Sequence, residues 1–214
     1  MSACAAALMV LTVTVAAGWA PLVRLDETVS VQAFASTYAH DGRTAFWTMV
    51  TDGAAPERMR DALLLAALVA TVMRRLDLAV WLVGLSLLEG IVAPASKHLL
   101  DRPRPEWADP ITVLASTSYP SGHATAAATS AVAIALVVRR RAVTAAMAVL
   151  AVSVAASRVL LGAHYPSDVV AGALLGTLLA MSTYALLRVP GWRPSGPGVT
   201  RPAPEREVAG AADS

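Results

Sequence analysis

Long runs of Ala, Leu and Val that contain almost no charge constrain how this chain can fold. Of the 214 residues, 56% are hydrophobic and only 15% are charged. A water-soluble domain of this length carries far more charge on its surface. Apolar stretches of about 20 residues instead match the thickness of a lipid bilayer. The composition therefore predicts an all-α integral membrane protein.

Six apolar segments are candidates for transmembrane helices, so the predicted fold is a bundle of six. Several are shorter than the roughly 20 residues that a perpendicular span needs, which leaves open whether the second crosses the membrane completely. Gly172 and Gly176 favour close packing of the sixth segment. The segments cover approximately residues 3–23, 60–73, 76–95, 121–138, 142–157 and 166–187, and the second gains a turn from Pro56-Glu57.

Two other regions differ in composition. Residues 24–56 mix apolar and aromatic residues with polar ones, which is typical of one or two short helices at the membrane interface, and Thr51-Asp52-Gly53 is predicted to be a turn. From Pro190 onward the chain lacks periodicity. The predicted organisation is a membrane domain at residues 1–188 and a disordered cytoplasmic tail at residues 189–214. A signal peptide is the alternative for the first segment, but no Lys or Arg precedes it, so a retained helix is favoured.

Three polar islands interrupt the apolar sequence, at residues 97–105, 120–123 and 157–168. The first begins with the only lysine of the chain. Ionisable residues beside membrane helices are costly and usually mark a functional site. The residues that stand out in the islands are Lys97, Arg104, Ser121, Gly122, His123, Arg158, His164 and Asp168.

The placement of arginines predicts which side of the membrane the islands occupy. With six spans, Arg74-Arg75, residues 139–141 and the four arginines after the sixth segment all lie on one side. The positive-inside rule makes that side cytoplasmic, with both termini there. All three islands then lie on the extracytoplasmic side, where they can converge. Because the Ala- and Arg-rich composition suggests a bacterium with a GC-rich genome, we expect the bacterial inner membrane.

The cations of the islands suit a phosphate group. Lys97 is a compact point charge, whereas the planar guanidinium groups of Arg104 and Arg158 can each hold two phosphate oxygens. Taken singly, each of the three could equally be a flanking residue that extends its charge to the interface.

The second island is predicted to begin a helix. Pro120 suits a first helical turn, and the N–H groups at a helix start bind anions. Gly122 allows the backbone to approach a phosphate oxygen, and the Ser121 hydroxyl can donate a further hydrogen bond. His123 is then within reach of the same anion. The alternative is an ordinary capped helix with a surface histidine.

The third island pairs a histidine with a carboxylate. His164 and Asp168 are four residues apart, which brings them together across one helical turn. Asp168 can accept a hydrogen bond from one imidazole nitrogen and leave the other unprotonated and nucleophilic. The alternative is a helix-capping aspartate beside an interfacial histidine.

Together the islands supply the groups that phosphoryl transfer requires. The cations, Ser121 and the Gly122 N–H would surround the equatorial oxygens, while His164 attacks phosphorus and forms a phosphohistidine. His123 would protonate the leaving oxygen as a general acid. Neither a metal nor another cofactor is required, because lysine and arginine neutralise the phosphate, and the His and carboxylate residues are few for a metal site.

The three islands resemble the signature of the type 2 phosphatidic acid phosphatase superfamily. Its blocks are Lys, six residues, Arg-Pro; then Pro-Ser-Gly-His; then Ser-Arg, five residues, His, three residues, Asp. Every fixed position is matched in order. The resemblance covers nearly the whole chain before the tail. It implies an active site at the outer face, with His164 as nucleophile, Asp168 as its partner and His123 as acid.

We therefore expect a metal-independent lipid phosphatase that keeps the chain of its substrate among the helices. By resemblance, the substrate is undecaprenyl or another polyprenyl diphosphate, phosphatidylglycerol phosphate or phosphatidic acid. The alternatives are an enzyme similar to the vanadium-dependent haloperoxidases, which are soluble, and a non-enzymatic transporter or binder of lipid headgroups. Nucleic acid is not an expected partner, because no basic run is interleaved with aromatic residues. The sequence leaves the oligomeric state open.

Overall fold

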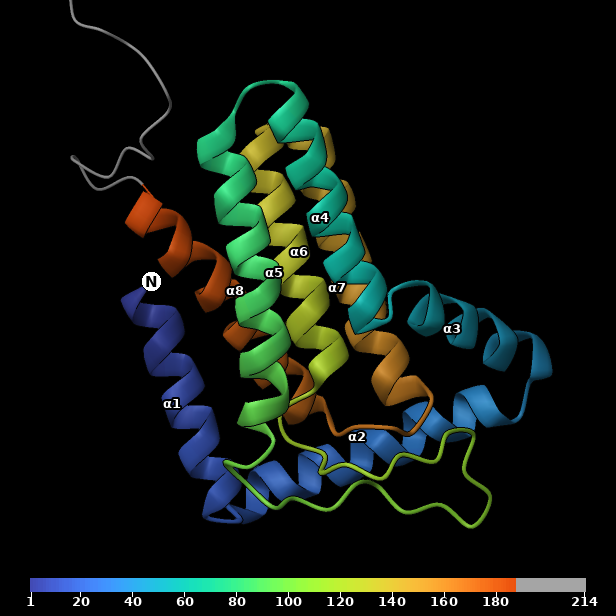
Figure 1. Cartoon of the computed structure of the whole chain (residues 1–214). Coiled ribbons are helices and arrows are strands. Elements are labelled where there is room, and N and C mark those ends of the chain that lie inside the picture. Colours follow the sequence, from blue (N-terminus) through green and yellow to red (C-terminus); the bar gives the residue numbers. More distant parts are fainter. Residues whose placement is uncertain (188–214) are drawn as a thin grey trace, which may run out of the picture.

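The computed structural model describes residues 1–187, and this part of the chain contains eight α-helices and no strand (Figure 1). The predicted all-α fold is confirmed. The predicted tail at residues 189–214 lies outside the described residues. The helices are α1 (Ser2–Ala16), α2 (Ala20–Tyr38), α3 (Asp41–Gly53), α4 (Pro56–Val72), α5 (Leu76–Ser96), α6 (Gly122–Val138), α7 (Arg141–Leu160) and α8 (Pro166–Leu187).

Five of the predicted membrane segments correspond closely to α4 through α8. Proline opens α4 and α8, because its missing N–H would have no partner in a first helical turn. Ser121 precedes α6, and its side chain accepts a hydrogen bond from the Ala124 N–H at 3.5 Å, as an N-cap residue does. Arg139 ends α6 in the left-handed conformation, with φ of 54°.

The first segment and the region after it differ from the prediction. α1 ends at Ala16 rather than near residue 23, and the chain bends by 90° into α2. Gly18 permits this bend because it adopts the left-handed conformation, with φ of 59°. The helices predicted between the first and second segments are α2 and α3. The turn predicted at residues 51–53 is wrong, since these residues form the last turn of α3 and the break falls immediately before Pro56.

α6 lies at the centre of the bundle and packs against α4, α5, α7 and α8 (Figure 1). Gly172 and Gly176 are on the face of α8 that contacts it. A Cβ atom at either glycine would overlap the backbone carbonyl oxygen of Ser121 or Thr125. The close approach of α6 and α8 therefore depends on these two glycines.

Large apolar side chains cover the outer surface of the bundle. Leu65 and Leu68 on α4, Leu87 and Ile91 on α5, and Val152 on α7 are all exposed. Three described helices, α5, α7 and α8, are long and apolar enough to cross a membrane alone, and the bent pair of α1 and α2 can supply a fourth span. α4 and α6 have 17 residues each. The chain is a multi-pass membrane protein, and the number of six spans stays a prediction.

The two ends of the bundle differ in character. Arg75 precedes α5 and Lys97 follows it, so the 21 residues of this helix place them at opposite ends. The arginine-containing turns between α4 and α5 and between α6 and α7 lie at one end (Figure 1). The connections from α5 to α6 and from α7 to α8 lie at the other end, with α2 running across them (Figure 1). The three polar islands are therefore gathered on one side.

Candidate active site

Lys97 joins the first island to the second. It caps the C-terminus of α5, and its Nζ donates hydrogen bonds to the carbonyl oxygens of Thr117 and Pro120, at 2.9 and 3.3 Å. Burial, together with the positive charges of Arg104 and Arg158, lowers the pKa of Lys97 to about 8. The ammonium group therefore lies beside the start of α6, close to other cations.

Arg104 binds the connection that carries His164. Its Nη1 donates to the carbonyl oxygen of Ala163 at 2.6 Å and lies 3.1 Å from His164 Nε2. Its other nitrogens donate to Ser116 and Thr117. Because a guanidinium group can only donate, Nε2 accepts, which places the imidazole proton on Nδ1.

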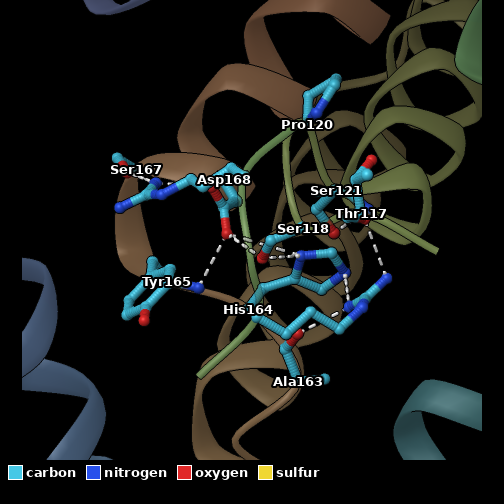
Figure 2. Close-up of polar contacts among 12 residues, drawn as sticks. Thr117, Ser118, Pro120, Ser121, Ala163, His164, Tyr165, Ser167 and Asp168 are labelled. Carbon is cyan, nitrogen blue, oxygen red and sulfur yellow. Dashed lines mark hydrogen bonds and ion pairs between the residues drawn. The ribbon is translucent and has the colours of Figure 1, made fainter. Parts of the chain in front are cut away.

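His164 and Asp168 lie together, as their spacing predicts. The distance from His164 Nδ1 to Asp168 Oδ2 is 3.7 Å, and Ser118 Oγ is 3.4 Å from the same nitrogen (Figure 2). The Ser118 hydroxyl and the Tyr165 N–H also donate to Oδ2, at 2.5 and 2.9 Å. Burial lowers the pKa of His164 to about 4, with Asp168 opposing this shift and Arg104 adding to it. The imidazole is therefore neutral at about pH 7.

The start of α6 faces the same connection. The Ser121 N–H donates to the carbonyl oxygen of Asp168 at 3.0 Å, which ties α6 to α8, and Ser121 itself is fully buried. A Cβ atom at Gly122 would meet no atom within 4 Å, so the space beside this backbone is open. His123 follows in the first turn of α6, within electrostatic reach of the three cations and His164.

Arg158 reaches the site from the end of α7. It is only 2% exposed, and its Nη1 donates to the Thr51 hydroxyl at 2.7 Å. Thr51 belongs to the last turn of α3, so this helix also contributes to the site. The Nε atom of Arg158 is buried and has no hydrogen-bond partner within residues 1–187. A buried guanidinium with an unused donor is suited to an anion.

All eight residues that the sequence singles out lie at this end of the bundle, and their catalytic roles stay predictions. Three further members of the network had no sequence signal strong enough to identify them. Arg102 lies at a variable position of the first block, Ser118 precedes the second, and Asp26 is one of several acids in residues 24–56. Arg102 donates to both Asp26 and Asp168. Its position inside the first block is the one clue that the sequence offers.

Other polar residues near the islands have different contacts. Glu89 pairs with Arg60 of α4 at 3.3 Å, rather than with Lys97. The Tyr119 hydroxyl is hydrogen-bonded to Thr12 of α1 at 2.7 Å, and His98 is exposed. In the part of the chain that the structure describes, no three His, Cys, Asp or Glu residues are grouped to hold a metal ion. The positive charge of the site comes from its lysine and arginines.

Cations around an oriented imidazole, at one end of an apolar helix bundle, are the groups that hydrolysis of a lipid phosphate requires. The fold and the site thus define the class of membrane-embedded lipid phosphatases. The chain belongs to the PAP2 superfamily, whose family model matches residues 78–192. No curated protein matches the sequence.

Two solved structures share this fold. One is the transmembrane PAP2-type phosphatidylglycerolphosphate phosphatase from Bacillus subtilis, with 23% sequence identity and a TM-score of 0.76; the similarity covers 88% of this chain and 98% of that one. The other is LpxE from Aquifex aeolicus, with 20% identity and a TM-score of 0.64 over 75% of this chain and 95% of that one.

Proposed function

We propose that this protein removes the terminal phosphate of a lipid phosphate or polyprenyl diphosphate through a phosphohistidine on His164, without a metal ion. The contacts of the two His164 ring nitrogens are the observation that carries the proposal. Arg104 contacts Nε2, while Asp168 and Ser118 face Nδ1, so the lone pair that would attack phosphorus points toward a cation. A protein that only binds a headgroup has no need for an imidazole oriented in this way.

The proposed reaction has two steps. First, His164 Nε2 bonds to phosphorus as the bond to the lipid oxygen breaks, and protonated His123 gives its proton to that oxygen. Lys97, Arg104 and Arg158 stabilise the charge on the equatorial oxygens. Second, a water molecule gives a proton to His123 while its oxygen bonds to phosphorus. Inorganic phosphate leaves, and His164 is regenerated.

The start of α6 would complete the phosphate-binding site. The open space beside Gly122 is suited to a phosphate oxygen, which could accept a hydrogen bond from the Gly122 N–H. The Ser121 hydroxyl, which now caps the helix, has a proton free to donate.

We place the reaction at the extracytoplasmic face of a bacterial inner membrane, with both termini in the cytoplasm. The arginine-containing turns support this orientation, because they lie at the end of the bundle opposite the site. Polyprenyl diphosphates, phosphatidylglycerol phosphate and phosphatidic acid all present a terminal phosphate. The fold shared with the Bacillus subtilis enzyme makes phosphatidylglycerol phosphate the first substrate to test.

Phosphate release from these three lipids by purified protein in nanodiscs, measured with and without EDTA, tests the proposal. We expect wild type to release phosphate and His164→Ala to be slower by roughly 10⁴-fold or more, because the nucleophile is lost. His98→Ala is the matched control, since His98 is an exposed histidine of the first island. A brief incubation with substrate that carries a radiolabel in its terminal phosphate should leave an acid-labile label on the wild-type protein and none on His164→Ala.

Two outcomes contradict separate parts of the proposal. Release that survives His164→Ala would exclude His164 as the nucleophile. Release that EDTA abolishes would exclude a reaction without a metal ion.

A further inference from the structure

Two buried carboxylates from different helices converge on Arg102. Its Nη1 donates to Asp168 Oδ1 at 2.6 Å, and its Nη2 donates to Asp26 Oδ2 at 2.8 Å. Nη1 also donates to the Ser167 hydroxyl at 2.7 Å, and the guanidinium carbon lies 4.3 Å from the centre of the Tyr165 ring. Only 15% of the Arg102 side chain is exposed. Removing any one of these charges leaves a buried partner uncompensated.

Asp26 reaches from α2 to the start of α8. Its Oδ1 accepts a hydrogen bond from the Ser167 N–H at 3.0 Å, and its Oδ2 accepts one from the Ser167 hydroxyl at 2.5 Å. Because the first N–H groups of a helix have no partner within it, Asp26 acts as a cap supplied by another helix. It thereby holds the turn that carries Asp168.

α2 also contacts the other side of the His164 connection. Phe34, two helical turns after Asp26 on the same buried face, stacks on Trp107 with ring centres 4.0 Å apart. Trp107 Nε1 donates to the carbonyl oxygen of Gly162 at 2.8 Å. Gly162 has a φ of 70°, and a Cβ atom there would overlap Trp107 and Phe34. α2 therefore holds the connection both before and after His164.

We propose that Arg102 and Asp26 are positioning residues for the pair of His164 and Asp168, and that α2 is therefore part of the catalytic apparatus. Arg102 donates a hydrogen bond to Oδ1 of Asp168, and the other carboxylate oxygen, Oδ2, faces His164 Nδ1. Asp26 fixes Arg102 and the first turn of α8 together. The inference rests on the function proposed above.

The geometry distinguishes positioning from phosphate binding. Both terminal nitrogens of Arg102 are paired with carboxylates that neutralise its charge, whereas the partners of Arg104 are all neutral, so Arg102 is not the arginine available to a phosphate. Its loss should change how His164 is presented to phosphorus rather than how tightly the phosphate is held. We therefore expect substitutions to lower kcat and to leave KM nearly unchanged.

Kinetics of Arg102→Gln, Asp26→Asn and the double variant test this expectation, with the folded fraction measured for each. We expect kcat to fall roughly 10- to 100-fold, the range seen when hydrogen-bond partners that orient metal-binding histidines are removed. KM should stay within about threefold of wild type. The double variant should be little slower than Arg102→Gln alone, because both substitutions act through the same carboxylate.

Leu82→Ala is the control for lost stability. Leu82 of α5 is fully buried in a cluster of apolar side chains that includes Leu63, Ala133 and Ala180, away from the site. This variant should therefore melt at a lower temperature with unchanged kcat per folded molecule. The inference is overturned if Arg102→Gln and Asp26→Asn, like Leu82→Ala, lose only thermal stability and keep the wild-type kcat. It is also overturned if the two variants raise KM and leave kcat unchanged. Should either fail to fold, Arg102→Lys and Asp26→Glu take their place, and a wild-type kcat in both overturns the inference.

Failure of the proposed function gives a different result. In that case wild type releases no phosphate from any lipid tested. The positioning inference is then decided by nitrogen NMR of the His164 ring, whose Nδ1 resonance must shift in Asp26→Asn and stay unchanged in Leu82→Ala. An unshifted resonance in Asp26→Asn would overturn it.

Discussion

The two ends of the helix bundle are held together by different interactions. In the half of the bundle nearer the arginine-containing turns, Ala70, Leu78 and Leu82 pack with small residues of α6 and α8. At the other end, buried charges such as Asp26, Arg102 and Asp168 are held by hydrogen bonds. A shortened leucine leaves a cavity, whereas a lost charge partner leaves a desolvated ion. We therefore expect the polar end to carry the chemistry and the apolar end to contribute mainly stability.

Arg104→Ala should give the largest difference between the ends. Removing a donor to the developing phosphate charge should lower kcat/KM roughly 10³-fold, measured by phosphate release. The control is Arg75→Ala, because Arg75 lies at the opposite end and has an exposed ion pair with Asp77 at 3.7 Å. Its activity and melting temperature should match wild type. Equal losses in the two variants would contradict the assignment of Arg104 to phosphate binding.

Alanine substitutions at two glycines should affect different properties, stability at Gly172 and activity at Gly122. Gly172→Ala should lower the free energy of unfolding by about 1–3 kcal/mol, because the new methyl group overlaps α6. Gly122→Ala should leave stability nearly unchanged, since its Cβ meets no atom. We expect Gly122→Ala instead to lower kcat/KM roughly tenfold, because the new methyl group would fill the space proposed for a phosphate oxygen. Melting curves and phosphate release measure both effects, and a Gly122→Ala variant with wild-type kcat/KM would exclude this place for the phosphate.

Lys97 should make phosphate binding sensitive to alkaline pH. Because its pKa is lowered to about 8, the ammonium loses its proton above that pH, and the inhibition constant of inorganic phosphate should rise by up to about tenfold per pH unit. The folded state binds fewer protons here than the unfolded chain between about pH 8 and 10, so the Lys97 contribution to stability increases with pH. Weaker phosphate binding above about pH 8 therefore cannot be attributed to unfolding caused by the deprotonation of Lys97.

Lys97→Arg is the matched variant for this measurement. Arginine keeps its charge over the same range, so its inhibition constant should be flat with pH. An equally steep rise in Lys97→Arg would show that another group titrates.

Features governed by near neighbours in the chain could be predicted from the sequence. Apolar runs specify α4 through α8, because a backbone in lipid must satisfy its hydrogen bonds within the helix. The four-residue spacing of His164 and Asp168 also keeps them near each other, although His164 precedes α8, so the turn before Pro166 rather than a helical turn sets their contact. The three polar islands gather at one end because successive helices reverse direction, which the order of the segments already implies.

Only the tertiary structure decided which distant groups complete the site. Arg102 and Asp26 are 76 residues apart, and Arg104 and His164 are 60 apart. Such partners depend on how α2 crosses the end of the bundle, which no spacing along the chain specifies. The bend at Gly18 that directs α2 there lies within a run that is apolar on both sides. Apolar pattern and local spacing therefore determined the helices and the proximity of His164 and Asp168. The crossing of helices decided which charges hold that pair in place, because a buried charge can be paired only by a group that the fold brings within hydrogen-bond distance.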